Sequence, residues 1–584
     1  MTTILGINAY HGDASACLLV NGRLVAAVEE ERFRRIKHWA GFPDRAIQAC
    51  LQAGGLRLDD VQHLAINSNP KANLRKKLSF VLRHRPEFKL VLERLRNAKE
   101  RGAITDELAR AFPGQKFSGE IHRIEHHEAH LASAYFASPF SEAALLSVDG
   151  FGDFSSAAWG IGRDGHLHVN ARTYFPHSLG FFYEALTHFL GFPNYGDEYK
   201  VMGLAPYGRP TYLDSMRRIV KLRPEGQFEL DLTYFKHHQE DVSYEWSGGT
   251  PTTNPFYTEA MSELLGPARS ASEPLTTRHQ DLAHSAQAMY EEAFFHMLAH
   301  IHHVHGVSDL ALAGGCAMNS VANGKVRRRS PFKRLYVQSA AGDAGGAIGA
   351  AMCVKSQLGD RTPCPMTHAY WGPEYTDLEI QESLTAHKQA LDEANCQIEH
   401  VTDEQVLCRN VANALAEGRV VGWFQGRMEW GPRALGNRSI LGDPRRNDMK
   451  DLLNLKIKRR ESFRPFAPSI LREYVGNWFE EDDDVPFMMK VFQIRKEQRE
   501  LIPAVTHEDG SGRLQTVTEQ DNPRYYRLIQ AFKEITGVPI LLNTSFNENE
   551  PVVCQPSEAI ACFLRTRMDM LVLGDHICSR QEQA

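Results

Sequence analysis

Two hairpin patterns, far apart in the sequence, constrain the fold of this chain most strongly. In the first, the runs ACLLV and RLVAAV flank Asn21-Gly22, and in the second SAAWGIG and HLHVNAR flank Asp164-Gly165. Asn-Gly and Asp-Gly between such runs are typical of tight β-hairpin turns. Helical patterns follow each hairpin. This repetition predicts an internally duplicated α/β fold in the N-terminal part of the chain.

The length of the chain and a proline-containing polar stretch indicate two domains. A chain of 584 residues exceeds the usual size of one domain. Pro363 and Pro365 interrupt a polar stretch, which is typical of a domain boundary. We therefore predict one α/β domain at 1–360 and a second α/β domain at 361–584. The second is expected to open with helices over 376–418, followed by the strand patterns RVVGWF, PILLNTSF and MLVLGD.

The overall composition argues against several classes of protein. The net charge of −6 argues against a chain that coats nucleic acid or an anionic membrane as a whole. No run of roughly 18 apolar residues is present, and the N-terminus lacks a signal-peptide pattern. The ten cysteines include no CxxC pair, as in reduced intracellular enzymes. We expect a cytoplasmic enzyme with neither a nucleic-acid nor a membrane partner.

Residues 70–115 stand out as a basic segment with a helical pattern that Pro86 interrupts. The simplest interpretation is a solvated amphipathic insertion. The alternative is a docking surface for an acidic partner, or a lid over an acceptor.

Two histidines and two aspartates predict a metal site. His126 and His130 are four residues apart in a helical pattern, so they share one helix face. Asp149 and Asp343 follow strand patterns and stand in glycine-rich turns. A set of two imidazoles and two carboxylates suits iron, zinc or manganese better than calcium. The alternative is a helix whose histidines lie in the core or in solvent.

Several glycine-rich segments of the first domain could hold a nucleotide. Gly12 and Gly150 lie in turns after strand patterns, where backbone N–H groups can face phosphate. Gly314 and Gly315 precede a helical pattern, and Asn319 follows in the same motif. Two such turns followed by a Gly-Gly-helix pattern are typical of actin-like ATPases.

The second domain contains a basic cluster over residues 423–472, where lysine and arginine outnumber the acids more than twofold. Arginine suits bidentate capture of phosphate. We predict that this cluster belongs to a site that binds a triphosphate or two phosphate-bearing ligands. The alternatives are an RNA-binding surface and a solvated basic face. Arg433, Arg438, Lys458 and Arg464 of this cluster alternate with glycine, proline and aromatic residues, and Arg513 and the strand end Asn543-Thr544-Ser545 follow later in the chain.

The motifs HHEAH, SVDGFGD, GDEYKVMGLAPYG, LAGGCAMN, AAGDAGG, EWGPRALGNRSIL, FRPFAPS and LLNTSFN together resemble the NodU/CmcH O-carbamoyltransferases. The resemblance covers nearly the whole chain. It implies an actin-like first domain, similar to the catalytic subunit that makes threonylcarbamoyl-adenosine on tRNA, and a YrdC-like second domain. It also implies that carbamoyl phosphate and ATP form carbamoyl adenylate and pyrophosphate, and that the carbamoyl group then moves to a hydroxyl of a sugar or natural product.

The resemblance also implies roles for individual residues. It assigns iron, or another divalent metal, to His126, His130, Asp149 and Asp343. It assigns the adenylate-forming site, where ATP would carry Mg²⁺, to Arg433, Lys458, Arg464, Arg513, Asn543 and Ser545. It makes His11 the catalytic histidine and places Lys37 on the acceptor side.

Four other activities compete with this interpretation. A tRNA threonylcarbamoyl transferase would use the basic segment, and a non-catalytic actin-like nucleotide-binding protein would need no second site. A hydrogenase-maturation carbamoyltransferase would carry CxxC zinc fingers, and a metalloprotease would carry HExxH. The sequence contains neither motif. It is compatible with a homo-oligomer and leaves the acceptor open.

Overall fold

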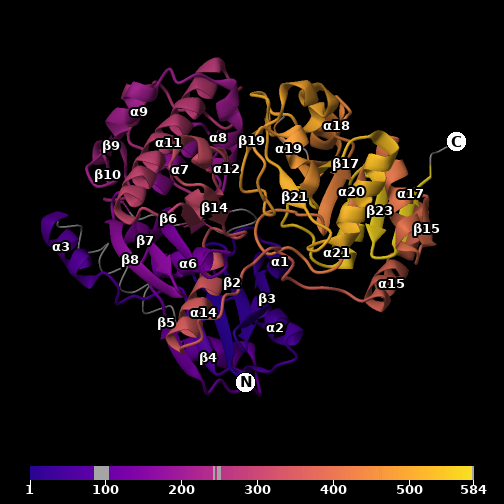
Figure 1. The fold of residues 1–584 in the computed structure, drawn as a ribbon, viewed down its shortest axis with the longest axis horizontal. Coiled ribbons are helices and arrows are strands. Elements are labelled where there is room, and N and C mark those ends of the chain that lie inside the picture. The colour runs from indigo at the N-terminus through magenta and orange to yellow at the C-terminus, as the bar shows by residue number, and fades with distance from the viewer. Residues whose placement is uncertain (85–103, 241–243, 246–250, 459–460, 462, 582–584) are drawn as a thin grey trace. The chain divides into compact units, whose positions relative to one another are not determined.

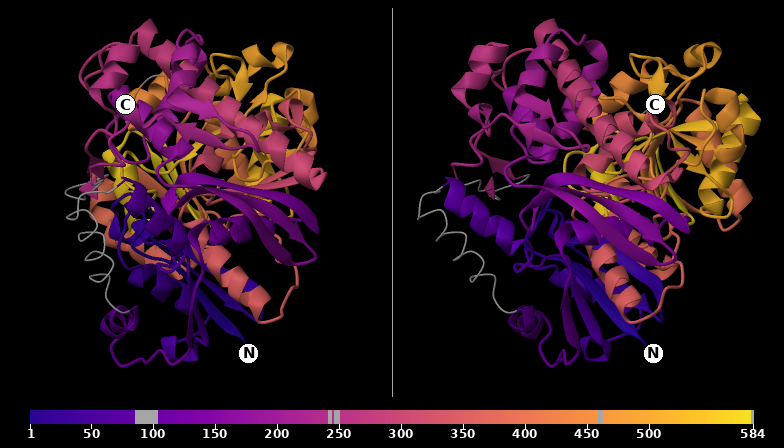
Figure 2. Two further views of the ribbon diagram at one scale, coloured as in Figure 1. Left: turned by 90° about the vertical axis from the view of Figure 1, so that its left-hand side faces the viewer. Right: turned by 60° about the vertical axis from the view of Figure 1, so that its left-hand side comes forward.

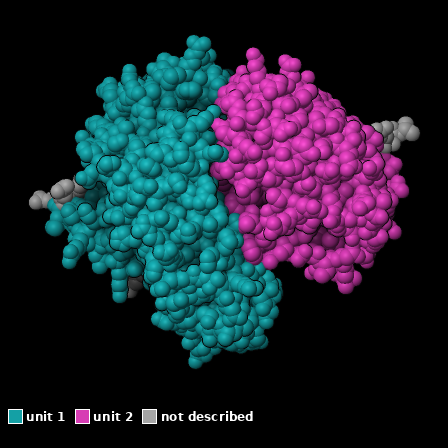
Figure 3. Space-filling model, viewed as in Figure 1, with its two compact units in different colours: residues 1–366 teal, residues 367–584 magenta. Residues whose placement is uncertain are grey.

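A computed structural model describes residues 1–84, 104–240, 244–245, 251–458, 461 and 463–581. The chain divides into two compact units, residues 1–366 and 367–584, which Figure 3 shows in different colours. This division lies close to the boundary predicted after residue 360.

The first unit opens with a five-stranded sheet. Its order is β3-β2-β1-β4-β5. The pairs β3-β2 and β2-β1 are antiparallel, whereas β1-β4 and β4-β5 are parallel. The strands are β1 (Thr3–Asn8), β2 (Ser15–Val20), β3 (Arg23–Glu29), β4 (His63–Ile66) and β5 (Glu120–Arg123).

A second five-stranded sheet repeats this topology. Its order is β8-β7-β6-β13-β14, with two antiparallel pairs followed by two parallel pairs. The strands are β6 (Glu142–Gly152), β7 (Ser155–Arg163), β8 (His166–Tyr174), β13 (Asp309–Ala313) and β14 (Arg334–Val337). Strand order and direction therefore agree between the two halves, as the predicted duplication requires.

Two helices join the halves of the first unit. Helix α6 (His126–Tyr135) follows the last strand of the first sheet but packs on β6, β7 and β13 of the second. Helix α14 (Gly345–Gln357) follows the last strand of the second sheet but packs on β1, β2 and β4 of the first. The two helices also pack against each other, in the middle of the unit (Figures 1 and 2). Each half thus covers the sheet of the other.

The remaining elements of the first unit include a group of helices around the long α11, which lies beside the second sheet in Figure 1. The further helices are α1 (Glu31–Arg34), α2 (Asp44–Ala53), α3 (Leu74–His84), α5 (Ile104–Ala111), α7 (Leu179–Phe189), α8 (Glu198–Leu204), α9 (Leu213–Ile219), α10 (Glu259–Leu265), α11 (Thr277–His305), α12 (Ser320–Gly324) and α13 (Val326–Arg329). The further strands are β9 (Val220–Leu222), β10 (Phe228–Leu230), β11 (Tyr244–Glu245) and β12 (Thr252–Thr253).

The second unit is built on an eight-stranded mixed sheet of order β15-β24-β23-β16-β17-β22-β18-β21. Its strands are β15 (Cys396–His400), β16 (Val421–Phe424), β17 (Arg438–Gly442), β18 (Ala467–Leu471), β21 (Gln515–Val517), β22 (Ile540–Ser545), β23 (Met570–Leu573) and β24 (His576–Arg580), and β19 (Phe492–Gln493) pairs with β20 (Ser511–Gly512). Its helices are α15 (Asp377–Ala386), α16 (Lys388–Glu393), α17 (Glu404–Ala416), α18 (Met449–Leu453), α19 (Val475–Trp478), α20 (Pro523–Thr536) and α21 (Pro556–Arg565). Both units are therefore α/β, as predicted.

Three details differ from the predictions or fall outside the described residues. Strand β15 interrupts the helices expected over 376–418. The turn expected at Gly150 belongs to β6, which continues to Gly152 through a register break after Val148. In the basic segment, helices α3 and α5 are described, but Pro86 lies outside the described residues. No helix in the described part of the chain combines the length and apolarity needed to cross a membrane.

Candidate functional site

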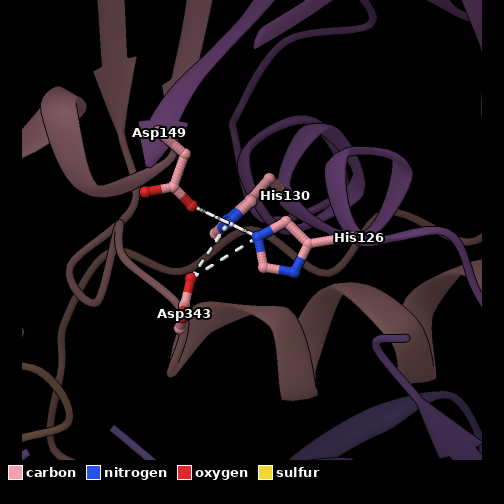
Figure 4. A group of neighbouring side chains, drawn as sticks. All are labelled: His126, His130, Asp149 and Asp343. Atoms are coloured by element: carbon pink, nitrogen blue, oxygen red, sulfur yellow. Dashed lines mark hydrogen bonds and ion pairs between the residues drawn. The ribbon is translucent and has the colours of Figure 1, made fainter. Parts of the chain in front are cut away.

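The four predicted metal ligands point toward one another in the first unit (Figure 4). The Nε2 atoms of His126 and His130 are 3.1 Å apart. Asp149 Oδ2 lies 3.2 Å from His126 Nε2 and 2.9 Å from His130 Nε2. Asp343 Oδ1 lies 3.5 Å from each of these nitrogens. One ligand atom from each residue therefore falls within 4.8 Å of the other three.

The local structure fixes the orientation of both histidines. Glu125 caps helix α6 by accepting a hydrogen bond from Glu128 N at 2.9 Å. His126 and His130 then lie on one face of the helix, and both are fully buried. His127 points elsewhere, because its Nδ1 lies 2.9 Å from Ser147 Oγ of β6. The histidines are therefore buried, and metal binding by His126 and His130 stays a prediction.

Asp149 is held by backbone groups on its far side. Its Oδ1 accepts hydrogen bonds from Gly150 N at 2.8 Å and Gly315 N at 3.0 Å, which leaves Oδ2 facing the imidazoles. A Cβ atom on Gly315 would lie 2.8 Å from Oδ1, and one on Gly152 would lie 2.0 Å from the His126 ring. These two positions require glycine because the site's own side chains occupy the space.

The electrostatics of this cluster favour a bound cation. Burial would lower the pKa of His130, but the hydrogen bonds with Asp149 and Asp343 raise it to about 9. Burial raises the pKa of Asp343, and the nearby Asp149 raises it further. Burial would also raise the pKa of Asp149, but its hydrogen bonds to the two histidines hold it well below the usual range. Two carboxylates and two imidazoles thus share a buried space, which a divalent ion would neutralise.

The spacing of the ligand atoms also fits a metal. Bonds of roughly 2.0–2.1 Å in a tetrahedral shell place neighbouring ligand atoms about 3.3 Å apart. The five distances given above run from 2.9 to 3.5 Å. The residues present therefore fit the predicted metal.

His11 lies next to this cluster. Its ring centroid is 5.3 Å from that of His126, in an edge-on arrangement. Asn8 of β1 holds the loop, because its Nδ2 donates to the backbone oxygens of Gly12 and Asp13 at 2.9 Å each. A Cβ atom on Gly12 would lie 2.8 Å from the Tyr195 hydroxyl, so the loop also fits closely against that residue. The structure thus brings His11 to the predicted metal ligands.

An ion pair next to this loop was not predicted. Asp13 Oδ1 lies 2.8 Å from His38 Nδ1, and His38 N donates to Glu31 Oε2 at 2.8 Å. Burial would lower the pKa of His38, but the charge of Asp13 raises it. Lys37, predicted on the acceptor side, precedes this histidine and is half-buried. No sequence pattern indicated that Asp13 and His38 form a pair.

The other residues predicted to bind nucleotide in the first unit have roles within the fold. Asn319 caps α12 by accepting from Ala322 N at 3.1 Å, and its Nδ2 donates to Gln287 Oε1 at 2.9 Å. Gly314 has a φ of 88°, and a Cβ there would lie 2.3 Å from Val148 O. Gly315 begins a single 3-10 turn instead of the longer helix expected. Nucleotide binding by these residues stays a prediction.

In the second unit, two of the predicted residues, Asn543 and Ser545, lie on β22, and a third, Lys458, contacts the end of this strand. Lys458 is buried, and its Nζ donates to the backbone and side-chain oxygens of Asn547 at 2.7 Å each and to Ser545 O. Asn543 Nδ2 donates to Ala434 O at 3.2 Å and Ser469 Oγ at 3.0 Å. Asn543 thus connects β22 to the loop that follows Arg433.

The three predicted arginines of the second unit lie at partly exposed positions. Arg433, Arg464 and Arg513 are half-buried, and Arg464 forms an ion pair with Glu461 at 3.6 Å. Burial lowers the pKa of His507 to about 4, and the nearby charge of Arg513 contributes to this shift. Arg438 of the same cluster is fully buried, with its guanidinium 3.6 Å from the centroid of the Phe424 ring and donating to backbone oxygens. Arg438 is therefore part of the buried core of the second unit.

Both units match parts of one protein family. Residues 3–352 match the family described as "Carbamoyltransferase N-terminus", and residues 412–580 match "Carbamoyltransferase C-terminus". The chain belongs to the carbamoyltransferase family. The resemblance noted in the sequence is thereby confirmed, and so is the expectation that the chain is an enzyme that transfers carbamoyl groups.

Two similar proteins align with nearly the whole of this carbamoyltransferase, and a third aligns with about half of it. An uncharacterized protein of Synechocystis sp. is 40% identical and aligns over 100% of this chain and 97% of its own length. Nodulation protein NolNO of Sinorhizobium fredii is 36% identical over 98% of this chain and 80% of its own length. The 3'-hydroxymethylcephem-O-carbamoyltransferase of Amycolatopsis lactamdurans is 37% identical over 47% of this chain and 49% of its own length.

Proposed function

We propose that this carbamoyltransferase forms carbamoyl adenylate from carbamoyl phosphate and ATP, and then carbamoylates a hydroxyl of a sugar or natural-product acceptor. The observation that carries the proposal is the buried His₂Asp₂ cluster with His11 beside it, in the unit that matches the family's N-terminal part. The cephem O-carbamoyltransferase among the similar proteins supports a hydroxyl as the acceptor.

The proposed pathway has three steps. First, water cleaves carbamoyl phosphate to carbamate and phosphate. A carbamate oxygen then attacks the α-phosphorus of Mg²⁺-bound ATP. The bond to the β-phosphate breaks, which releases pyrophosphate and leaves carbamoyl adenylate. The acceptor oxygen then attacks the carbamoyl carbon, AMP leaves, and the hydroxyl proton passes to a base.

His11 is the proposed base. An alcohol is a poor nucleophile near neutral pH, and imidazole is the side chain best suited to accept a proton there. Asn8 holds the loop that carries His11 through Gly12 and Asp13. Iron or another divalent metal, held by His126, His130, Asp149 and Asp343, would supply Lewis-acid stabilisation of negative charge on the donor.

The second unit is proposed to form the adenylate. Arg433, Arg464 and Arg513 would bind the phosphates of ATP and carbamoyl phosphate. An ammonium has three N–H donors, and those of Lys458 are used by Ser545 and Asn547. In this arrangement Lys458 fixes the Ser545 hydroxyl and the neighbouring backbone, so its contribution to the site is to position them.

The proposed compartment is the cytoplasm, which the proposed substrates and the cysteines support. All ten cysteines are free thiols in the structure. Free thiols and the use of ATP fit the cytoplasm, where disulfides are kept reduced.

The first prediction separates the two reactions. With carbamoyl phosphate, ATP, Mg²⁺ and a panel of hydroxylated acceptors, the wild-type enzyme should release pyrophosphate and add about 43 Da to its acceptor. His11→Asn should lower the transfer rate by about 10²–10⁴-fold, because the general base is lost, while pyrophosphate release continues. Mass spectrometry of the acceptor and a pyrophosphate assay measure the two steps.

The matched control is His303→Asn, which changes an exposed histidine of α11 and should leave both steps intact. Transfer at the wild-type rate in His11→Asn would exclude His11 as the base. A wild-type enzyme that releases no pyrophosphate with any acceptor would exclude the adenylate.

The second prediction concerns Lys458. Lys458→Met removes the donor to four oxygens of Ser545 and Asn547, and each buried group left unsatisfied costs about 1–3 kcal/mol. We expect a lower unfolding temperature and a loss of pyrophosphate release of more than about tenfold, since Ser545 and Asn547 lose their support. Lys496→Met, on an exposed lysine of the same unit, should change neither quantity. Normal release from folded Lys458→Met would contradict the positioning role.

A further inference from the structure

A second group of metal-binding side chains lies on the first sheet, on β4 and its neighbour β5. His63 begins β4, and Glu120 and His122 lie on β5. The register pairs His63 with Glu120. Residues two apart on a strand share a face of the sheet, so Glu120 and His122 stand on the same side. One ligand atom of each residue lies within 4.8 Å of the other two.

The spacing of these atoms suits a small cation. His63 Nδ1 is 3.1 Å from His122 Nε2. Glu120 Oε2 is 3.7 Å from His122 Nε2 and 4.0 Å from His63 Nδ1. Neighbouring ligands of a tetrahedral zinc ion are about 3.3 Å apart, so the two nitrogens are already close to this distance. The Glu120 side chain is 69% exposed and can move the remaining few tenths of an ångström.

A similar group of side chains in the second unit has a geometry that suits a metal ion less well. In the second unit, Asp377, His400 and His576 also gather. There the two imidazole rings are stacked, with 8° between their planes. The in-plane lone pairs of stacked rings run parallel and do not meet at one point, and Asp377 Oδ1 already lies 2.9 Å from His576 Nε2. The rings of His63 and His122 are tilted by 51°, so their nitrogens can face a shared ion.

We propose that His63, Glu120 and His122 bind a divalent first-row transition metal ion, of which zinc is the best fit, with water as the remaining ligand. Two imidazoles, one carboxylate and a water are a common set for zinc. This site is separate from the cluster of Figure 4 and shares no residue with it.

The proposed ion would link the edge strand β5 to its neighbour β4. β5 is the last strand of its sheet and pairs only with β4 among the described residues. It also leads directly into α6, which carries His126 and His130. An ion shared by β4 and β5 would therefore hold the start of the segment that presents the catalytic-site histidines. The role is structural, and binding should raise the unfolding temperature of the folded enzyme.

Metal counting tests the proposal. Untagged full-length enzyme, stripped with a chelator, is titrated with Co²⁺ and separately with Zn²⁺. We expect the double variant His63→Gln/His122→Gln to bind one equivalent fewer than the wild type and to lose the corresponding tetrahedral Co²⁺ absorption. The zinc-induced rise in unfolding temperature should shrink in the same variant. The measurement is a difference between two proteins, so it does not depend on carbamoyl transfer or on the other cluster.

Two further variants make the result decisive. His400→Gln removes a histidine of the stacked cluster and should bind as many ions as the wild type. Glu120→Gln alters an exposed side chain that folding does not need, and should weaken binding by about tenfold or more. Equal stoichiometry and affinity in wild type and double variant would overturn the proposal. So would unchanged affinity in Glu120→Gln, or an equal loss of ions in His400→Gln.

Discussion

Asp149→Asn is expected to empty the metal cluster of the first unit and to stop carbamoyl transfer. Asp149 Oδ2 contacts both His126 and His130, while Oδ1 is held by two backbone N–H groups. Asparagine keeps the shape but removes the negative charge that balances the cation. Loss of a supporting group around a metal costs about 10–100-fold, and loss of a direct ligand should cost at least about 100-fold in metal affinity and transfer rate. Metal content after dialysis and acceptor carbamoylation measure the two effects.

The control for this prediction is Asp164→Asn. Asp164 is exposed in the turn between β7 and β8 and has a φ of 50°, which asparagine tolerates. It removes the same charge without touching the cluster, and should leave metal content and transfer unchanged. If Asp149→Asn retains metal and activity while Asp164→Asn does likewise, the cluster of Figure 4 is not the metal site.

The second large effect is expected from Gly349→Ala, at the contact between α14 and α6. A Cβ atom at Gly349 of α14 would lie 1.8 Å from Ala129 O of α6. Alanine favours the helix by about 1 kcal/mol over glycine. Overpacking a core costs about 1–3 kcal/mol even when side chains can adjust, and here the obstacle is backbone. The clash should therefore outweigh the gain in helix propensity. We expect the free energy of unfolding to fall by about 2 kcal/mol or more, and the unfolding temperature to fall by about 4 °C or more.

Metal affinity should fall together with stability in Gly349→Ala, because α6 presents His126 and His130. Gln357→Ala, at the exposed end of the same helix, should change stability by less than about 0.5 kcal/mol. A Gly349→Ala enzyme as stable as the wild type would show that the two helices do not need this close approach. Calorimetry and metal analysis of the two variants distinguish these outcomes.

The sequence predicted the parts of this enzyme that local patterns determine. The hairpin turns at Asn21-Gly22 and Asp164-Gly165 revealed the duplication, since Gly after Asn or Asp accepts the positive φ that such turns need. The spacing of His126 and His130 placed two ligands on one helix face. Asp149 and Asp343 could be added because both follow strand patterns in glycine-rich segments.

Contacts between distant segments could not be predicted in this way. The hydrogen bond from Gly315 N to Asp149 joins residues far apart in the sequence, so glycine at 315 resembled a phosphate loop. The pairing of Asp13 with His38, and the support of Lys458 by Asn547, likewise depend on tertiary packing. Strand β15 was missed because CQIEH is polar and largely exposed, and it forms a strand through pairing with β24.

The exchange of helices between the two halves of the first unit has a consequence for biosynthesis. Three of the four ligands precede residue 150, whereas Asp343 immediately precedes α14, which packs back on the first sheet. A growing polypeptide on the ribosome can therefore hold a partial ligand set early, but the tight, closed set exists only after both halves have been translated. Loading of the proposed metal ion would thus be a late event, and a product truncated before Asp343 would lack one of the four predicted ligands.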